Sequence, residues 1–321
     1  MNASILYIVI PCYNESEVLR TTAQKLKEKM TALFEQKKIS SESKIMFVND
    51  GSKDDTWQII KELHKEDNIF TGISLSRNRG HQNALLAGLM TAKDYADAVI
   101  SMDADMQDDI DAIDRFIEAF YNGNDIVYGV RSSRQTDTFF KRNTALTFYR
   151  LMNWLGADTV YNHADYRLMS KRALQGLSQF GEVNLFLRGL VPMVGYTSTT
   201  VEYVRNRRLA GESKYPLKKM VAFAIDGITS LSIKPITLIT KLGLIIFLVS
   251  LIALIWVLVV KLTGHAATGW SSILVSIWML GGLQLLAIGV IGEYIGKIYK
   301  ETKHRPRYII SENLEEQTVN N

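Results

Sequence analysis

Short apolar runs alternate with helical patterns over residues 1–130. The runs have the length of strands, and the segments between them repeat apolar residues at helical spacing. The expected strands are Ile5–Pro11, Ile45–Asn49, Phe70–Leu75, Ala98–Met102 and Asp125–Val130. The expected helices are Glu15–Phe34, Asp55–His64, Gln82–Ala92 and Ile110–Tyr121. This alternation predicts an α/β domain with a mostly parallel sheet that helices cover on both faces.

Two long uncharged runs follow nearer the C-terminus. Leu242–Val260 has no charged residue, and as a helix it would be about 28 Å long, close to one hydrocarbon core. Ala266–Gly292 is a second such run and is less apolar. Their length favours membrane spans over the alternative, buried helices of a soluble core. The connection around residues 262–265 is short, so the two runs predict a two-helix transmembrane hairpin.

The basic residues around the hairpin predict its orientation. Lysines and arginines flank its two outer ends, whereas only Lys261 and His265 lie near the turn. The positive-inside rule therefore places both ends and the first domain in the cytoplasm, at the inner (cell) membrane. No signal peptide is expected, because Ser4–Pro11 has the length of a strand.

The expected organisation therefore has five parts. They are a cytoplasmic domain (1–215), a juxtamembrane segment (216–235), transmembrane helices 1 (236–262) and 2 (266–292), and a cytoplasmic basic tail (293–321). The juxtamembrane segment suits an amphipathic helix at the membrane surface and equally an ordinary surface helix of the domain. Small residues such as Gly292 and Gly296 allow close helix packing, so a homo-oligomer is one expectation.

Charge and cysteine content exclude several classes of protein. The net charge is +4, but basic and acidic residues are equal in number over 1–215, so the excess lies beside the hairpin. No nucleic-acid partner is expected, because the large domain has no surplus of positive charge. A single cysteine excludes a disulfide framework and a cysteine-based zinc site. A hydrophobic content of 47% excludes a disordered chain.

Polar residues cluster directly after three of the expected strands. Tyr13–Glu15 follow the first, Asp50–Ser52 the second and Asp103–Gln107 the fourth. In parallel α/β sheets, ligands bind at the carboxyl ends of the strands, so these segments are the candidate site. The sequence has neither the glycine fingerprint of dinucleotide-binding proteins nor a P-loop, which argues against both classes.

The acidic segment predicts a divalent cation. Asp103, Asp105 and Gln107 are spaced by two, and on an extended chain their side chains would point the same way. Oxygen ligands of this kind suit Mg²⁺ or Mn²⁺. The alternative is a solvated acidic turn that caps a helix, since Asp108, Asp109 and Asp111 continue the acidic run.

The motifs together resemble a known family. Ile8–Glu15, Val48–Ser52, Ser76–Gln82 and Asp103–Gln107 resemble glycosyltransferase family 2 in order and spacing. Within that family the chain is most similar to polyprenyl-phosphate glycosyltransferases, which include dolichyl-phosphate mannose synthases and bactoprenol glucosyltransferases. Two further matching segments are Asp165–Ser170 and the basic loop Arg208–Tyr215.

The resemblance implies a GT-A nucleotide-sugar-binding fold for the first domain, and a hexosyltransferase activity. One sugar would pass, with inversion, from a nucleotide-sugar to undecaprenyl (polyprenyl) phosphate at the cytoplasmic membrane face. UDP-glucose is the favoured donor, while UDP-N-acetylglucosamine, UDP-galactose and GDP-mannose stay open. A lipid phosphate is largely ionised at neutral pH and needs little help from a general base.

The resemblance also implies roles for residues of the site. Asp105 and Gln107, with Asp103 nearby, would hold Mg²⁺ or Mn²⁺, and Asp103, Asp105, Asp165 and Arg167 form the expected catalytic set. Nucleotide binding is expected of Pro11, Tyr13, Glu15 and Asp50.

Phosphate of the acceptor needs cations, and guanidinium forks suit it well. The expected acceptor-phosphate residues, which approach the hairpin in sequence, are Arg131, Arg208, Ser213 and Lys214. Asp165 could act as a base or orient Arg167, and orientation with sugar contact is favoured. His81 suits a structural hydrogen bond better than a direct role.

Other functions compete with this one. A processive polysaccharide synthase shares the fold, but no Trp here follows an Arg, as the synthase motif requires. A non-catalytic membrane scaffold would have no need of the acidic and basic motifs. A channel or transporter subunit would be expected to carry intramembrane charges, which the two apolar runs lack.

Overall fold

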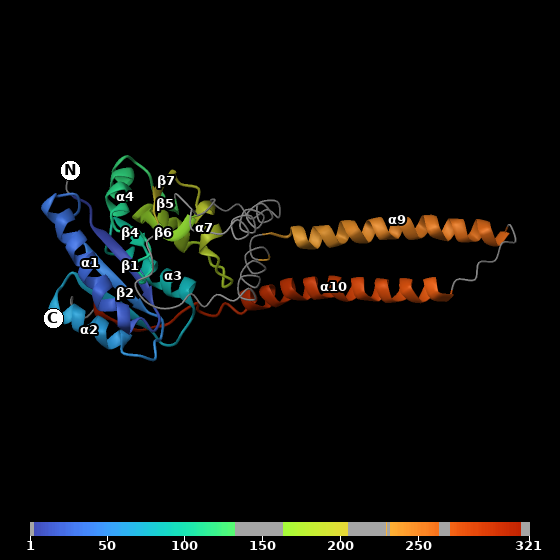
Figure 1. The fold of residues 1–321 in the computed structure, drawn as a ribbon, viewed down its shortest axis with the longest axis horizontal. Helices are drawn as coiled ribbons and strands as arrows, with labels where there is room; N and C mark the ends of the chain where they lie inside the picture. Colours follow the sequence, from blue (N-terminus) through green and yellow to red (C-terminus); the bar gives the residue numbers. More distant parts are fainter. Residues whose placement is uncertain (1–2, 132–162, 205–228, 230–231, 263–269, 316–321) are drawn as a thin grey trace. The chain divides into compact units, whose positions relative to one another are not determined.

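The computed structural model describes residues 3–131, 163–204, 229, 232–262 and 270–315 (Figure 1). The chain divides into two units. The sheet unit comprises Met1–Tyr149, Asp158–Pro216 and Arg305–Asn321. The helical unit comprises Arg150–Ala157 and Leu217–His304. The sheet unit therefore contains residues from both before and after the helical unit.

One eight-stranded sheet organises the described part of the sheet unit. Its strand order is β7-β5-β6-β4-β1-β2-β3-β8. The strands are β1 (Leu6–Cys12), β2 (Lys44–Asn49), β3 (Phe70–Leu75), β4 (Ala98–Ser101), β5 (Ile126–Arg131), β6 (His163–Ser170), β7 (Ser198–Tyr203) and β8 (Ile310–Asn313). Strands β3, β2, β1 and β4 pair in parallel, as do β5 and β7. Strand β6 runs antiparallel to both β4 and β5, and β8 runs antiparallel to β3.

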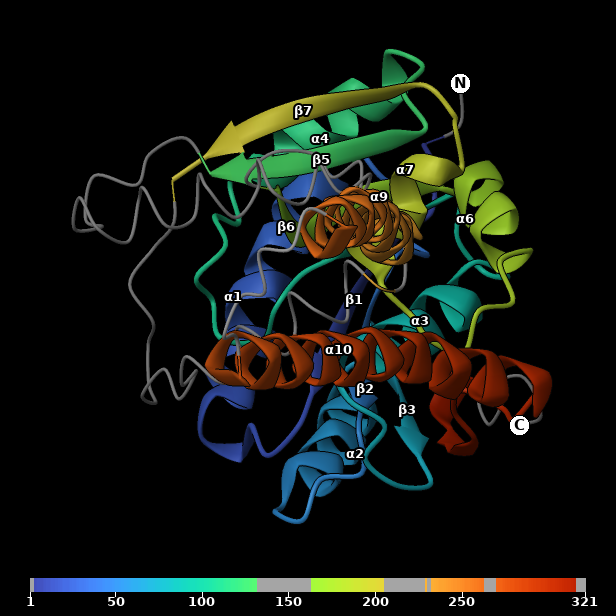
Figure 2. The ribbon, with the colours of Figure 1, turned by 90° about the vertical axis from the view of Figure 1, so that its right-hand side faces the viewer.

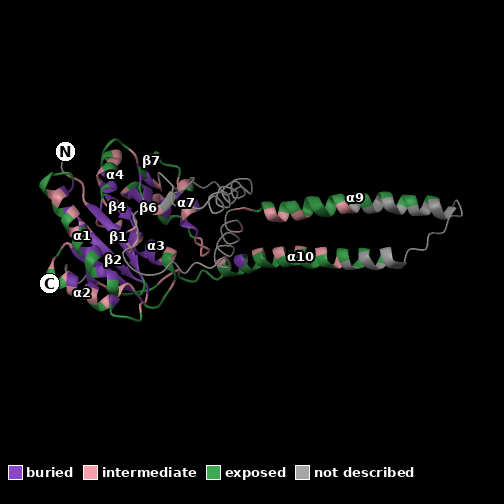
Figure 3. Cartoon of the chain, viewed as in Figure 1, coloured by how far each residue is buried: buried purple, intermediate pink, exposed green. Residues whose placement is uncertain are grey.

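Helices cover both faces of this sheet. The helices are α1 (Ser16–Glu35), α2 (Thr56–Glu66), α3 (His81–Ala92), α4 (Ala112–Tyr121), α6 (Lys171–Ser178) and α7 (Leu187–Met193). Alternate residues of β1 show the two faces, because Ile8 and Ile10 pack in one core with α1, α2 and α4. Tyr7 and Val9 pack in the other core with α3, α6 and α7. The strands are accordingly buried, and the outer sides of α1, α2 and α4 are exposed (Figure 3).

The predicted α/β domain with a mostly parallel sheet is confirmed. All five expected strands are present as β1–β5, and the four expected helices are α1–α4, with ends that differ by a few residues at most. Short continuous apolar runs are typical of strands that are buried on both faces, which is why these strands could be predicted. Strands β6, β7 and β8 are additional findings, and β6 interrupts the parallel order.

Strand β8 belongs to the segment that the sequence analysis expects to be a basic tail. Ser76 donates its backbone N–H to Ile309, which extends the pairing beyond β8. Trp57 Nε1 donates to Glu312 Oε1 at 3.0 Å. Glu315 is only 5% exposed, and its Oε1 accepts from Tyr7 Oη at 3.0 Å and Lys44 Nζ at 2.7 Å. The chain after the helical unit therefore completes the sheet unit and its core.

The helical unit contains two long helices, α9 (Lys234–Leu262) and α10 (Trp270–Thr302). Helix α10 continues past residue 292, where the sequence analysis ends the second span. Within the described residues, one stretch, Met279–Thr302, is long and apolar enough to cross a membrane. Tyr294 Oη donates to the carbonyl of Ser232 at 2.6 Å, which ties α10 to the residues just before α9.

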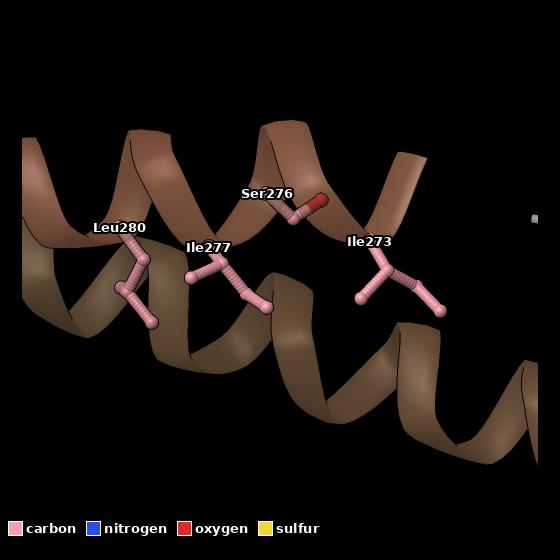
Figure 4. A pocket seen from close by; sticks show the side chains of 4 residues that line it. All are labelled: Ile273, Ser276, Ile277 and Leu280. Atoms are coloured by element: carbon pink, nitrogen blue, oxygen red, sulfur yellow. The ribbon is translucent and has the colours of Figure 1, made fainter. Parts of the chain in front are cut away.

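Exposed aliphatic side chains mark the surface of α10. A shallow hollow along this helix is lined by Ile273, Ser276, Ile277 and Leu280, which recur at helical spacing (Figure 4). Such an uncovered apolar surface is unusual for a helix in water and is typical of a helix that contacts lipid or another helix.

The contacts of Glu315 give a testable prediction about stability. Removal of this carboxylate in Glu315→Ala takes the shared acceptor away from the buried Tyr7 hydroxyl and the half-buried Lys44 ammonium group. We expect the free energy of unfolding of the sheet unit to fall by about 3 kcal/mol. This free energy is measured by urea titration of the full chain in detergent, with unfolding monitored through a spectroscopic signal of tertiary structure.

The exposed Glu42, whose carboxylate also acts electrostatically on Tyr7, serves as the control. Glu42→Ala should change the free energy of unfolding by at most about 0.5 kcal/mol. Equal midpoints for Glu315→Ala and the wild type would show that the C-terminal strand does not stabilise the sheet unit.

Candidate active site

The strand directions bring several loops to one edge of the sheet. Strands β1–β4 are parallel to one another, and β5 and β7 share their direction because β6 is antiparallel to both β4 and β5. Their carboxyl ends therefore lie at the same edge, together with the amino end of β6. This is where the sequence analysis places its candidate residues.

The loop after β1 is held by the loop after β2. Asn14 donates its N–H to Ser52 Oγ at 3.0 Å, and Asn14 Oδ1 accepts from the Lys53 N–H at 2.9 Å. Glu15 donates its N–H to Thr56 Oγ1 at 2.9 Å. Pro11 is buried inside β1, whereas the ring of Tyr13 is 42% exposed at the edge. Tyr13 thus presents an aromatic surface on a backbone that the second loop fixes.

Asp50 is buried and shapes the loop after β3. Its Oδ1 accepts from the N–H of Arg79 at 2.7 Å, and its Oδ2 accepts from Gly80 at 2.9 Å. Burial raises the pKa of Asp50, although the two N–H groups favour its charged form. Beside it Gly51 has a φ of +63°, and a Cβ there would lie 2.5 Å from the Arg77 carbonyl carbon. The loops after β2 and β3 therefore pack at backbone contact, which requires glycine.

The acidic segment after β4 is a turn, so the expectation of an extended chain from Asp103 to Gln107 is wrong. Strand β4 ends at Ser101, and Met106 has a φ of +55°. The Gln107 N–H donates to Asp105 Oδ1 at 3.2 Å across this turn. An Asp side chain that caps its own turn competes with the extended form, and here the turn prevails.

The residues after this turn are tied to the far side of the sheet. Tyr203 Oη, at the end of β7, donates to Asp108 Oδ1 at 2.6 Å. Arg131 Nε, at the end of β5, donates to Tyr203 Oη at 3.4 Å. Burial and the nearby Asp103 raise the pKa of Asp108 to about 6. Arg131 therefore lies beside the acidic turn.

Asp165 is the centre of the charged network. Its Oδ1 accepts from Arg167 Nη2 at 2.6 Å and from Arg188 Nε at 3.2 Å, and its Oδ2 accepts from Arg188 Nη2 at 3.1 Å. His81 Nε2 lies 3.7 Å from Asp165 Oδ2 and 3.6 Å from Asp103 Oδ1. One carboxylate thus joins β6, α7, the start of α3 and, through His81, the acidic turn.

The electrostatics follow from these contacts. Although burial works against its charge, Arg188, His81 and Arg167 hold the pKa of Asp165 well below its usual range. Desolvation likewise opposes the charged His81 ring, but Asp165 and Asp103 raise its pKa. Asp165 is therefore an ionised partner of cations and is poorly suited to accept a proton at neutral pH.

The acidic turn suits a divalent cation. Burial raises the pKa of Asp103, and the carboxylates of Asp165 and Asp105 raise it further, although His81 opposes them. A cation would relieve this repulsion between carboxylates. Within the described residues, no three His, Cys, Asp or Glu side chains are already arranged to hold a metal ion. Mg²⁺ typically takes one or two carboxylates and completes its shell with water and substrate phosphates, which fits this turn.

The structure thus places most of the predicted site residues at one edge. Asp103, Asp165 and Arg167 meet in one network, and Asp105, Gln107 and Arg131 lie on or beside the acidic turn. Pro11 lies near the end of β1, and Tyr13, Glu15 and Asp50 lie on the first two loops. Arg208, Ser213 and Lys214 lie outside the described residues.

Sequence reasoning missed the roles of Arg188 and Tyr203 and underrated His81 and Asp108. His81 belongs to a recognised motif, and Asp108 continues the acidic run, so both had a signal. Arg188 and Tyr203 lie in segments without one, and they are found only through their contacts.

This edge, with its paired loops and acidic turn on a mostly parallel sheet, defines a GT-A-like α/β fold of a glycosyltransferase. Residues 7–177 match the model of the family described as glycosyl transferase family 2. The chain belongs to that family.

Similar proteins extend the match to the whole chain. The uncharacterized glycosyltransferase YkoT of Bacillus subtilis is 54% identical over 97% of this chain and 92% of its own. The bactoprenol glucosyl transferase of Shigella phage SfV is 42% identical over 94% and 97% of the two chains. The solved structure of mannosyl-3-phosphoglycerate synthase from Rubrobacter xylanophilus, at 14% identity, covers 70% of this chain and 71% of that chain with a TM-score of 0.46, a likeness too low to support a further conclusion.

The Asp165 network gives a prediction about coupling. Arg188→Met keeps the apolar stem of the side chain but removes its charge, and Asp165→Asn removes the opposite charge. We expect the two changes to be non-additive by about 2 kcal/mol in the free energy of unfolding, since each one removes the same contact. A double-mutant cycle of urea titrations measures this.

The surface pair of the half-buried Lys93 and the exposed Asp94, 3.1 Å apart, provides the comparison. Its cycle of Lys93→Met and Asp94→Asn should give a coupling of about 0.5 kcal/mol or less. An equally small coupling between Asp165 and Arg188 would contradict the central place given to this contact.

Proposed function

We propose that this enzyme transfers a single hexose from a nucleotide-sugar, with UDP-glucose favoured, to undecaprenyl phosphate at the cytoplasmic face of the cell membrane. The observation that carries this proposal is the ionised, fully engaged Asp165 at the centre of the site. The name of the Shigella phage relative, a bactoprenol glucosyl transferase, supports the choice of acceptor and sugar.

The acceptor chemistry explains why a site of this kind needs no general base. A sugar hydroxyl must lose a proton when it attacks, whereas a phosphate monoester has a second pKa near 6 and is already ionised. Asp165 is held by Arg167 and Arg188 and stays charged, so it orients these cations rather than taking a proton. The phosphate itself would displace the nucleotide, and a single displacement inverts the anomeric carbon.

The donor would occupy the loops after β1 and β2. Tyr13 offers an aromatic face to the base, and Pro11 and Glu15 bracket it on the same segment. The two carboxylate oxygens of Asp50 accept hydrogen bonds from the Arg79 and Gly80 N–H groups. Asp50 would thereby fix the loop after β3 beside the bound nucleotide. Preorganised loops of this kind reduce the entropy that binding costs.

Asp105 and Gln107, with Asp103 nearby, are the residues that would hold Mg²⁺ or Mn²⁺. A divalent cation bound there would neutralise the charge that develops on the leaving diphosphate. His81 lies against Asp103 and Asp165, so it fixes the side of the turn that faces the Arg167 and Arg188 cations.

The acceptor phosphate would be bound by cations at the far side of the turn. Arg131 ends β5 beside Asp108, so its guanidinium can meet a phosphate near the site of transfer. Arg208, Ser213 and Lys214, in the basic loop that precedes the membrane segment in sequence, complete the proposed set.

A multi-pass membrane anchor completes the proposal. Its parts are the juxtamembrane segment 216–235 and the spans 236–262 and 266–292, and a homo-oligomer packed through these helices is compatible with it. Strand β7 precedes the helices, strand β8 follows them, and both belong to one sheet. A chain that leaves one sheet and returns to it must cross a membrane an even number of times, which supports a two-helix hairpin.

Radiolabelled donor and undecaprenyl phosphate in detergent test the transfer directly. We expect a singly glycosylated lipid, lost on EDTA treatment and restored by Mg²⁺ or Mn²⁺. Asp105→Asn should lower the rate by at least about 100-fold. Asp111→Asn, at an exposed carboxylate near the same turn, should keep it within about twofold of wild type.

Other outcomes would favour the competing functions. Long glycan products would indicate a processive synthase, and no transfer from any donor would indicate a scaffold. Full activity in EDTA would refute the metal assignment.

Thiol labelling tests the hairpin. In a chain whose single cysteine is replaced (Cys12→Ala), Thr263→Cys lies between the two expected spans and Lys303→Cys lies after them. We expect a membrane-impermeant maleimide to label the cysteine at 263 in intact cells, and the one at 303 only after permeabilisation. Equal labelling of both in intact cells would contradict the proposed topology.

A further inference from the structure

Arg131 and Tyr203 are opposite each other at the ends of two parallel strands. Strands β5 and β7 lie side by side and run in the same direction (Figure 2). They pair from Ile126 and Ser198 onward, and the last pair in register is Arg131 with Tyr203. Both strands end there, at the carboxyl edge of the sheet that carries the site. The two side chains are therefore brought together by the register of the sheet as well as by their own contact.

The hydroxyl of Tyr203 uses both of its hydrogen-bonding functions. It donates to Asp108 Oδ1 at 2.6 Å and accepts from Arg131 Nε at 3.4 Å. A hydroxyl has one proton to donate, so the short bond to Asp108 directs its lone pairs toward the arginine. Tyr203 thereby connects an anion of the acidic segment with a cation of the proposed acceptor site.

The position of this hydroxyl is fixed by packing. Tyr203 is 1% exposed, and its ring meets that of Tyr166 edge to face at 5.2 Å between centroids. Tyr166 in turn donates its own hydroxyl to the carbonyl of Asp109 at 2.9 Å. The two tyrosines thus hold Asp108 and Asp109 against the sheet, which leaves the Tyr203 hydroxyl little freedom.

The negative charge of Asp108 explains why a cation lies beside the Tyr203 hydroxyl. It is 2% exposed, and its Oδ2 has no hydrogen-bond partner within the described residues. A buried carboxylate oxygen without a hydrogen-bond partner favours a cation close by, and Arg131 is held close to Asp108 because both bind the Tyr203 hydroxyl. The tie through Nε uses the donor nearest the arginine stem, and it orients the plane of the guanidinium.

We propose that Tyr203 is a positioning residue for the lipid acceptor: its hydroxyl, anchored on Asp108, holds the Arg131 guanidinium where the acceptor phosphate binds. This inference rests on the proposed function. It assigns a task to a tyrosine on β7 whose hydroxyl contacts Asp108 and Arg131. Loss of the hydroxyl should weaken acceptor binding and leave the donor unaffected.

The test is Tyr203→Phe, which retains the buried ring and removes one oxygen. With undecaprenyl phosphate varied, we expect the acceptor KM to rise about 10-fold, the scale of one lost charge-assisted hydrogen bond. The turnover number and the KM for UDP-glucose should stay within about twofold, because uniform binding of one substrate appears in its own KM.

Tyr7→Phe is the matched control. Tyr7 is also a buried tyrosine of the same sheet whose hydroxyl donates to a buried carboxylate, that of Glu315, but it lies away from the carboxyl edge. Both variants should lose similar thermal stability. Only Tyr203→Phe should change the acceptor KM.

A second arm tests whether Tyr203 acts through Arg131. Arg131→Ala should raise the acceptor KM at least as much as Tyr203→Phe does, and Tyr203→Phe should add less than about twofold in that background. Multiplicative effects, or an unchanged acceptor KM in Tyr203→Phe, would overturn the inference. If Tyr203→Phe did not fold, an unchanged acceptor KM in Arg131→Ala would overturn it and a raised one would support it.

Failure of the proposed function would look different. In that case the wild-type enzyme itself would transfer no sugar to undecaprenyl phosphate, whatever stands at position 203.

Discussion

The site depends on the ion pairs that the Asp165 carboxylate makes with Arg167 and Arg188. Arg167 is 1% exposed, and a buried guanidinium is tolerated only when an anion pairs with it. Asp165 supplies that charge from two residues away on β6, and it also holds Arg188 from α7. His81 then connects the same carboxylate to Asp103 in the acidic turn. The cation side and the anion side of the site are therefore placed relative to each other by one side chain.

This arrangement fits an enzyme whose acceptor brings its own negative charge. The buried charges fix cations and a carboxylate-rich turn, and under the proposed function the acceptor phosphate requires no proton acceptor at the centre. Tyr203 extends the same principle to the far side, where its hydroxyl links Asp108 with Arg131. At the other edge of the sheet, Glu315 ties the residues that follow the helices to β1 and β2. The chain thus leaves the sheet unit, forms the two long helices and then returns to contribute β8 and Glu315 to the same unit.

The elements that could be predicted from the sequence are those with a clear local pattern of apolar and polar residues. Strands β1–β5 are apolar runs buried on both faces, and α1–α4 repeat apolar residues at helical spacing. Their positions could therefore be predicted from these patterns. Strand β8, Ile310–Asn313, is short and mostly polar, and it is defined by its pairing with the edge strand β3 rather than by a local pattern. The acidic segment was expected to be extended, but it forms a turn with Met106 at positive φ. This turn depends on the hydrogen bond from the Gln107 N–H to the Asp105 side chain, which the spacing of the residues does not reveal. The contacts of Asp165 with His81 and Arg188 span many residues in sequence and have no local signature at all.

The central claim is that the acceptor phosphate displaces the nucleotide directly, with Asp165 occupied by cations and no side chain acting as a nucleophile. The anomeric configuration of the product tests this most directly. With UDP-α-glucose as donor and undecaprenyl phosphate as acceptor, proton NMR of the purified glucosyl phospholipid should show a β-linked glucose. An α-linked product would mean two displacements through a glycosyl-enzyme intermediate, or a front-face reaction, and would contradict the account.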